Sequence, residues 1–574
     1  MTDPVLSVRG LSVTLHRDGV PNQVLSDVSF DVMPRGITAL VGESGSGKST
    51  IGLATQGLLA RDAAPLVTGS IRLAGAEVVG AAAPDLLRLR QKLVRMVPQD
   101  PLSALNPVMR VGRQLREGAG RDQRPEDWLP RVGLPDAARI MGAWPHQLSG
   151  GQRQRVLIAM AMMSGAPLIV ADEPTTALDV TVQAQILRLL RQLATDQGTA
   201  VLFVTHDLGV ASDLADRIVV LYGGRIAEHG AATPVLTAPR HPYSRALLAA
   251  RFDLAADRTR PLPVTAGDPP GPAAVRVGCA FAPRCDWALD LCRAVTPPLA
   301  TPDDAGTSVA CHRTDDVRGA VVSHAPDWPV VADKSEAALL LAEVSLAFGA
   351  LQVLRGITLS VRKGEAVALV GISGSGKSTI LRVVAGLLRP LTGQVTVHGG
   401  QPQMVFQDAM SSLTPWLSVG EQLAERLRPL RLPNREARLR VQQALAQVGL
   451  PPETARALPR ELSGGQAQRV AVARAIVVPP AVLLCDEPIS AMDVSLAAQT
   501  LNLLGQLRRQ LGMAMLFVTH DLAAARIIAD RIVVLDKGLI VEDGPAEDVA
   551  AHPASAQARE LIAATPRVHV GAWP

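Results

Sequence analysis

The sequence predicts an α/β fold that occurs twice within one chain of 574 residues. Apolar runs of strand length, at 37–41, 168–171 and 201–205, stop at loops that carry polar motifs, and segments of helical period follow them. Buried strands that end in such loops are typical of a largely parallel sheet, which places its ligands at the carboxyl ends of the strands. We therefore expect two such sheets, each with a binding site along that edge.

The duplication is visible in four motifs that recur in the same order. GESGSGKST at 42–50 returns as GISGSGKST at 371–379, LSGGQ at 148–152 returns at 462–466, DEP at 172–174 returns at 486–488, and FVTHDL at 203–208 returns at 517–522. The last three pairs are separated by the same number of residues, whereas the first pair is further apart. The first copy therefore carries extra residues, at about 60–90, between its first motif and its glutamine segment.

The composition changes between the two copies. Pro and Gly become frequent there, helical periodicity fades, and four of the five cysteines occur in this stretch. We therefore expect four parts, which are a first cassette at 1–250, a cysteine-bearing module with a linker at 251–335, a second cassette at 336–550 and a carboxyl-terminal tail at 551–574.

The overall composition, with 48% hydrophobic and 19% charged residues, is that of a globular protein. A net charge of +4 and only 3% aromatic residues argue against binding nucleic acid or a lipid surface. The first residues have no basic region followed by an apolar one, so we expect no secretory signal. The longest apolar stretch, about 337–354, is too short and too polar to span a membrane. We expect a cytosolic chain without disulfides.

GxxxxGK[ST] after an apolar strand predicts a phosphate-binding loop in each copy. Glycines let successive backbone N–H groups point at phosphate oxygens, and the following helix adds partial positive charge. The alternative is a Gly-rich turn that only opens a helix. We expect the two lysines to reach the β- and γ-phosphates of ATP and the serines after them to ligate Mg²⁺. The expected nucleotide-binding residues here are Gly42, Ser44, Gly45, Gly47, Lys48, Ser49 and Thr50, and Gly371, Ser373, Gly374, Gly376, Lys377, Ser378 and Thr379.

An acidic pair follows another apolar strand in each copy. Asp172 and Asp486 are expected to hold Mg²⁺ through water. Glu173 and Glu487 come next, and we expect them to polarise the attacking water, either as a base or as a group that positions the water. The alternative for these acids is a structural role in capping a turn.

Two further polar residues recur in matched positions after strands. His206 and His520 are expected to donate a hydrogen bond to the γ-phosphate as neutral imidazoles, and their matched positions favour this over a structural role. Gln99 and Gln407, in MVPQD and MVFQD, are expected to contact Mg²⁺ or the water.

With these motifs placed, the chain resembles the ABC ATPase family over nearly its whole length, and LSGGQ makes the resemblance specific. It implies two P-loop NTPase cassettes, each with an antiparallel and a helical subdomain, that pair head to tail. Ser463 and Gly465 would then complete the site on Lys48, and the first signature would complete the site on Lys377. The signature residues are Ser149, Gly150, Gly151 and Gln152, and Ser463, Gly464, Gly465 and Gln466.

The resemblance also covers the D-loop and the adenine contact. TALD at 176–179 and SAMD at 490–493 match the D-loop of the family. Family members stack adenine on an aromatic residue of the first strand, a role that Phe348 matches in the second copy. The first copy offers Leu15 beside His16, so we expect weaker stacking there.

Within the family, the chain resembles the oligopeptide/dipeptide-permease ATPases through PQDPLSALNP at 98–107, PHQLSGGQRQR at 145–155 and HPYSRALL at 241–248. This implies an ATP-hydrolysing subunit of an importer of peptides, nickel or a related small solute, peripheral on the cytoplasmic face of the membrane. The expected partners are two transmembrane permease subunits and an extracytoplasmic solute-binding protein. Because the cassettes are fused, no second ATPase subunit is needed, and no nucleic acid is expected. The second copy is less faithful, with TPW at 414–416 and HPAS at 552–555.

Two other functions remain open from the sequence. Dual-cassette ATPases that remodel ribosomes also lack membrane spans, but a long charged helical pair links their cassettes, whereas the linker here is Pro-rich. Excision-type DNA-repair ATPases insert large zinc modules into their cassettes, whereas the spacing from phosphate loop to LSGGQ is unbroken here. Both differences favour transport.

Four cysteines, Cys279, Cys285, Cys292 and Cys311, occur in the segment between the cassettes. Their spacing is not that of a zinc ribbon, and four thiolates suit either a [4Fe–4S] cluster or structural Zn²⁺. The pattern resembles the cysteine element of the peptide-permease ATPases, for some of which an iron–sulfur cluster is implied. Unligated thiols are the third alternative. Cys485, in a strand, is expected to be core packing.

Overall fold

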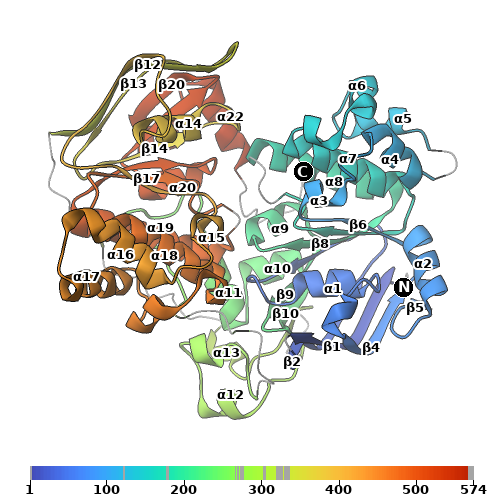
Figure 1. Cartoon of the computed structure of the whole chain (residues 1–574). Coiled ribbons are helices and arrows are strands. Elements are labelled where there is room, and N and C mark those ends of the chain that lie inside the picture. The colour runs from blue at the N-terminus through green and yellow to red at the C-terminus, as the bar shows by residue number, and fades with distance from the viewer. Residues whose placement is uncertain are drawn as a thin grey trace.

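Two cassettes lie side by side in the computed structural model, the first coloured blue to green and the second yellow to red in Figure 1. The structure describes residues 3–17, 19–120, 123–175, 180–265, 267, 271, 277–301, 306–317, 327–328, 336–490 and 492–565. No helix in this described part combines the length and the apolar character that crossing a bilayer requires.

Each cassette has a central sheet of mainly parallel strands. The first sheet has the order β11-β10-β9-β3-β8-β7-β6 and the second has the order β16-β17-β18-β14-β19-β20. The strands of the first are β3 (Ile37–Val41), β6 (Val94–Val97), β7 (Leu168–Asp172), β8 (Ala200–Thr205), β9 (Arg217–Tyr222), β10 (Arg225–Ala231) and β11 (Ser308–Val309). Those of the second are β14 (Ala366–Val370), β16 (Gln403–Val405), β17 (Val482–Asp486), β18 (Ala514–Val518), β19 (Arg531–Asp536) and β20 (Leu539–Pro545). In these sheets the pairs β9–β10, β10–β11 and β19–β20 are antiparallel, and the other pairs are parallel.

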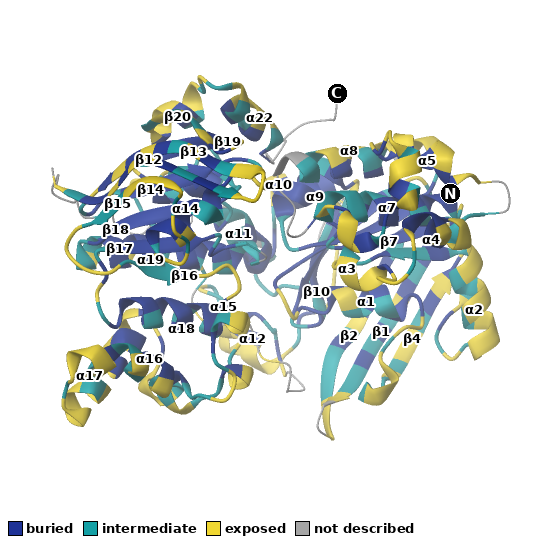
Figure 2. Ribbon diagram, turned by 45° about the horizontal axis from the view of Figure 1, so that its top comes forward, coloured by how far each residue is buried: buried dark blue, intermediate teal, exposed yellow. Residues whose placement is uncertain are grey.

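The central strands are buried because both faces of each sheet are covered. Every residue of β3, β7, β8, β14, β17 and β18 is buried. Figure 2 shows β7, β14, β17 and β18 in dark blue, with helices around them. Burial on both faces explains why these strands read as continuous apolar runs. The three predicted strand segments are confirmed as β3, β7 and β8, the last two each longer by one residue.

A smaller antiparallel sheet packs against one face of each central sheet and shares its apolar core. The first is β2-β1-β4-β5 and the second is β13-β12-β15. Their bounds are β1 (Leu6–Arg17), β2 (Val20–Val32), β4 (Leu66–Leu73) and β5 (Ala76–Glu77), and β12 (Ala337–Phe348), β13 (Leu351–Arg362) and β15 (Thr392–Val397).

Helices cover the other face and form the helical subdomains, whereas α1, α2 and α14 pack on the face that the antiparallel sheet covers. In the first cassette they are α1 (Lys48–Ala54), α2 (Ala83–Lys92), α3 (Pro101–Ala104), α4 (Val111–Gly118), α5 (Pro125–Arg131), α6 (Ala137–Gly142), α7 (Gly150–Met163), α8 (Val180–Gln197), α9 (Leu208–Leu214), α10 (Ala232–Thr237) and α11 (Pro242–Ala249). In the second they are α14 (Lys377–Val384), α15 (Ala409–Ser412), α16 (Val419–Leu427), α17 (Asn434–Gln447), α18 (Gly464–Ile476), α19 (Val494–Leu511), α20 (Leu522–Ile528), α21 (Ala546–Ala551) and α22 (Ala556–Ala564). Extra residues of the first copy form β5 and α2; the second has only loop at 398–402, between β15 and β16.

The segment between the cassettes divides between them. Leu262 is buried in the core of the second cassette, where its N–H donates to Asn502 Oδ1 at 2.9 Å and its carbonyl accepts from Asn502 Nδ2 at 2.8 Å. The cysteine-bearing part contains the 3-10 turn η3 (Ala282–Arg284), α12 (Asp290–Ala294) and α13 (Thr314–Val317). Helices α12 and α13 project at the bottom of Figure 1. Strand β11 joins this part to the first cassette by pairing with β10.

Candidate active sites

A phosphate-binding loop connects β3 to α1 and another connects β14 to α14. Gly47 and Gly376, just before each helix, have φ of 102° and 105°, a region that side chains rarely adopt. A Cβ on Gly47 would also lie 2.5 Å from Leu25 Cδ2. These glycines let the loop turn tightly into the helix, so that backbone N–H groups face the space in front of the helix terminus.

The loop lysines are buried and held by the loop itself. Lys48 Nζ donates to the carbonyls of Gly42 at 2.7 Å and Glu43 at 2.9 Å, and Lys377 makes the same two bonds in the second copy at 2.8 Å each. Burial lowers the pKa of Lys48, and it outweighs the negative charges of Glu173 and other carboxylates, which raise this pKa. Each ammonium is thus fixed at the centre of its loop, where a phosphate would meet it.

The expected Mg²⁺ ligands meet in both copies. Ser49 Oγ donates to Asp172 Oδ1 at 3.1 Å, and Ser378 Oγ donates to Asp486 Oδ1 at 2.8 Å. Burial raises the pKa of both aspartates, because their charge is withdrawn from water. A hydroxyl and a carboxylate at one point are oxygen donors of the kind that Mg²⁺ takes.

Glu173 and Glu487 adopt the same unusual backbone conformation, with φ of 43° and 46°. A positive φ costs free energy for a residue with a side chain, and such strain concentrates at functional sites. It aims each carboxylate at the matched glutamine and histidine. Gln99 Nε2 donates to Glu173 at 3.1 Å, and Gln407 Nε2 donates to Glu487 at 3.4 Å.

The histidines pair with the same glutamates. His206 Nδ1 lies 3.2 Å from Glu173 Oε1, and His520 Nδ1 lies 3.3 Å from Glu487 Oε2. Burial alone would lower the pKa of each histidine, but the hydrogen bond and charge of its glutamate outweigh burial and raise it. The sequence predicted neutral imidazoles. In the structure, the contact with the glutamate shifts each imidazole towards the protonated form.

Each signature turn forms a capping box at the start of a long helix. Ser149 Oγ accepts from the N–H of Gln152 at 3.3 Å, and the Gln152 side chain accepts from the N–H of Ser149 at 3.1 Å, at the start of α7. Ser463 and Gln466 repeat this at the start of α18, at 3.2 and 3.0 Å. The first turn of each helix therefore offers backbone donors and a positive dipole end to an anion.

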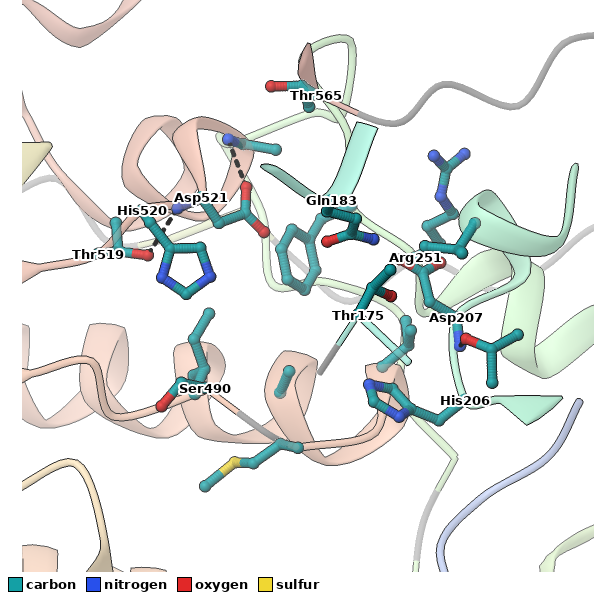
Figure 3. Close-up of a pocket in the computed structure, with 18 of the residues that line it drawn as sticks. Thr175, Gln183, His206, Asp207, Arg251, Ser490, Thr519, His520, Asp521 and Thr565 are labelled. Atoms are coloured by element: carbon teal, nitrogen blue, oxygen red, sulfur yellow. Dashed lines mark hydrogen bonds between the residues drawn. The ribbon is translucent and has the colours of Figure 1, made fainter. Parts of the chain in front are cut away.

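A pocket of about 170 Å³ lies between the two cassettes and is lined by both of them. Figure 3 shows His206 and His520 on opposite sides of this pocket, each from its own cassette. The N–H of Ser44, in the first phosphate loop, donates to Asp493 Oδ2 of the SAMD segment at 3.4 Å. The D-loop of the second cassette therefore contacts the phosphate loop of the first. The TALD segment at 176–179 lies outside the described residues.

The family model described as "ABC transporter" matches residues 25–176 and 354–490. The chain belongs to the ABC transporter family. A second family model, described as "Oligopeptide/dipeptide transporter, C-terminal region", matches residues 227–292. These residues include the HPY segment and three of the four clustered cysteines.

Curated relatives of this ABC protein match it from end to end. The oligopeptide transport ATP-binding protein OppD of Mycobacterium bovis is 39% identical over 98% of each chain. The peptidoglycan transport ATP-binding protein YejF of Agrobacterium fabrum is 37% identical over 98% of this chain and 96% of its own. This chain is therefore an ATP-binding and ATP-hydrolysing subunit of an ABC importer. A solved RNase-L Inhibitor structure covers 92% of this chain and 88% of its own, with 20% identity and a TM-score of 0.57, and shows the fold alone.

The expected adenine contact differs between the two sites of this ABC ATPase. Phe348 ends β12 and is 54% exposed, so its ring is free of the core. Leu15 and His16 stand at the matching end of β1, and His16 Nδ1 lies 3.1 Å from the carbonyl oxygen of Ala64. An aromatic face is thus available at the second site and an aliphatic side chain beside an imidazole at the first.

The fold brings together the four clustered cysteines, which lie up to 32 positions apart in the sequence. Cys279, Cys285, Cys292 and Cys311 line one cavity of about 20 Å³. Burial raises the pKa of Cys279 and Cys311, and raises that of Cys285 to about 11, so these groups are protonated thiols in this arrangement. Within the described residues, no three His, Cys, Asp or Glu side chains are arranged to hold a metal ion. The donor types suit a metal, whereas their present spacing does not.

Two functional positions were missed by the sequence reasoning. Glu43, the second residue of the first phosphate loop, is 3% exposed, and Arg284 of the cysteine-bearing segment binds it. The signal was the difference between GESGSGKST and GISGSGKST, where a carboxylate in one copy replaces an isoleucine in the other. Cys485, by contrast, is buried in β17 as expected.

Proposed function

We propose that this ABC ATPase powers the uptake of peptides or a related small solute through two separate transmembrane permease subunits. The match of residues 227–292 to the oligopeptide/dipeptide transporter region carries this proposal, together with the transport functions named for the relatives. The chain would act as a peripheral subunit at the cytoplasmic face of the membrane, with an extracytoplasmic binding protein delivering the solute.

In the proposed cycle, ATP joins the two cassettes and hydrolysis separates them. Each triphosphate would lie between one phosphate loop and the signature turn of the other cassette, with Mg²⁺ held by the serine and aspartate that meet in each copy. The contact from Ser44 to Asp493 supports this head-to-tail pairing, because it already brings the D-loop of one half to the phosphate loop of the other. Closing the pair would then be transmitted to the permeases.

The glutamate, histidine and glutamine of each copy would act on the attacking water. Glu173 accepts hydrogen bonds from its neighbours on both oxygens, so it can orient a water or remove its proton. His206 would exchange its contact with Glu173 for the γ-phosphate once ATP is bound. The second copy has the same set, with Glu487 and His520.

Co-purification tests this function. An affinity-tagged chain expressed in its native host and extracted with mild detergent is expected to retain two integral membrane proteins in equal amounts. The complex should hydrolyse ATP faster when reconstituted with a binding protein loaded with peptide. Recovery of ribosomal subunits or DNA instead of membrane proteins would overturn the proposal in favour of a remodelling or repair ATPase.

For the cysteine cluster, we propose a [4Fe–4S] cluster, with Zn²⁺ as the alternative. The support is the donor chemistry of four thiols that converge on one small cavity of a segment with little regular secondary structure. The thiols would have to draw closer together to ligate the group, which would then act as a staple. Cys279, Cys285, Cys292 and Cys311 would ligate it as thiolates after loss of their protons. The group would hold the segment together, and no step of ATP hydrolysis passes through it.

Metal analysis after anaerobic purification distinguishes the alternatives. We expect iron and acid-labile sulfide in equal amounts, a brown protein, and loss of both in Cys285→Ser. The control Cys485→Ala, which removes the thiol outside the cluster, should keep the iron. One zinc ion per chain and no iron would overturn the cluster in favour of structural Zn²⁺. A colourless protein without iron or zinc would show that the four thiols are unligated.

A further inference from the structure

A buried ion pair ties the cysteine-bearing segment to the first phosphate loop. Arg284 Nη1 donates to Glu43 Oε2 at 2.6 Å and Arg284 Nη2 donates to Glu43 Oε1 at 3.2 Å, so the ion pair is bidentate. The two side chains are 4% and 3% exposed. Glu43 lies between Gly42 and Ser44 of the loop, and Arg284 directly precedes Cys285. A residue of the cysteine-bearing segment therefore reaches the wall of the ATP site.

Both tyrosines of the chain belong to this contact. Arg284 Nη1 also donates to the hydroxyl of Tyr222 at 3.2 Å, and the backbone N–H of Glu43 donates to the hydroxyl of Tyr243 at 2.8 Å. The rings of Tyr222 and Tyr243 lie 4.5 Å apart, and Phe281 of the cysteine-bearing segment packs at 5.1 and 5.4 Å from them. This aromatic cluster excludes water from the ion pair, which strengthens it.

The contact extends to the lysine that would meet the phosphates. The carbonyl of Glu43 accepts from Lys48 Nζ at 2.9 Å, while its N–H and its carboxylate are held by Tyr243 and Arg284. All three polar parts of Glu43 are thus bonded, on one side to the loop lysine and on the other to residues outside the loop. A shift of Arg284 would move the backbone that surrounds Lys48.

The second cassette has the same loop without this contact. Its residues at the positions of Glu43, Tyr222 and Tyr243 are Ile372, Asp536 and Ala554. Lys377 nevertheless makes the same bonds to its loop, and the glycine before the helix has nearly the same φ. The ion pair is therefore not required to fold such a loop. It is an added constraint at one of the two ATP sites.

We propose that Arg284 is a positioning residue for the first ATP site, which through Glu43 makes ATP affinity at Lys48, and not at Lys377, depend on the cysteine-bearing segment. Removing only Arg284 leaves a buried carboxylate unpaired beside the triphosphate, which is far more costly than replacing both partners with apolar groups. The coupling is reciprocal, so ATP at the first site also stabilises the segment. This inference needs ATP binding alone and does not depend on the solute.

A double-mutant cycle on nucleotide affinity tests the proposal. Arg284→Met, Glu43→Ile and the double variant are made in a full-length Lys377→Ala background, where binding of Mg²⁺ and a non-hydrolysable ATP analogue reports the first site. We expect Arg284→Met to weaken binding by about 30-fold or more, and the double variant to return to within about 3-fold of its parent. Glu43→Ile is the substitution that the second copy already contains at that position.

Two controls separate positioning from folding. The same variants in a Lys48→Ala background report the second site and should leave its affinity unchanged. Arg293→Met removes an exposed arginine of the same segment, paired with Asp290 at the surface, and should leave both sites unchanged. A lower melting temperature with unaltered affinity at the first site, or equal losses at both sites, would overturn the proposal.

Discussion

Replacing Glu173 and Glu487 together by glutamine is expected to lower ATP hydrolysis by about 100-fold or more, with ATP binding retained. Each glutamate accepts contacts from a glutamine and a histidine, and an amide lacks the charge to polarise water between them. The lysine and serine of each phosphate loop are untouched, so ATP should remain bound between cassettes that cannot reopen. Steady-state phosphate release and retention of radiolabelled ATP measure the two effects.

A matched control makes the same chemical change away from the site. Glu117→Gln alters an exposed carboxylate that pairs with Arg113 on α4, and it should leave turnover unchanged. The single variants show how far one site can work alone. If the double variant still hydrolyses ATP at a tenth of the normal rate or faster, neither glutamate acts on the attacking water.

Gly464→Asp in the second signature is expected to weaken ATP retention at the first site by about 100-fold, through repulsion between the new carboxylate and the γ-phosphate. Gly464 suits this test because a Cβ there would meet nothing within 4 Å, so the substitution fits without displacing a neighbour. Gly465 is less suitable, since its Cβ would lie 2.8 Å from Leu496. Gly464→Ala is the neutral control and should retain ATP.

The cassette that responds identifies the pairing. With Lys377→Ala, only the first site binds, and Gly464→Asp should release its ATP. With Lys48→Ala, only the second site binds, and Gly464→Asp should have little effect because that signature does not face it. Loss of ATP from the second site alone would show that each cassette completes its own site, and head-to-tail pairing would be wrong.

Local chemistry explains how much of each site could be predicted from the sequence. A phosphate loop, an acid at the end of a strand and a capped signature turn are formed by residues close in sequence, and their function requires those residue types. The meeting of Ser49 with Asp172 was expected because both follow parallel strands of one sheet, whose carboxyl ends share an edge. Gln99 was expected to contact Mg²⁺ or the water, and its hydrogen bond to Glu173 comes from the structure.

The upward shift of the histidine pKa values could not be derived in this way. The pKa of His206 depends on a balance between burial and the charge of Glu173, and both depend on packing around the pair. The strained φ of Glu173 is likewise visible only in the folded backbone. Nothing in the DEP motif distinguishes a glutamate that points at its histidine from one that points at solvent.

The sequence by itself determined the two cassettes, the phosphate chemistry and the family, because repeated motifs encode short-range geometry that does not depend on distant parts of the chain. The tertiary structure alone decided which distant groups touch. Glu43 and Arg284 are 241 positions apart, and their ion pair exists only because η3 folds against the first phosphate loop. The sequence shows that a glutamate in one loop stands where the other has isoleucine, but the distant partner that this carboxylate binds becomes visible only in the fold.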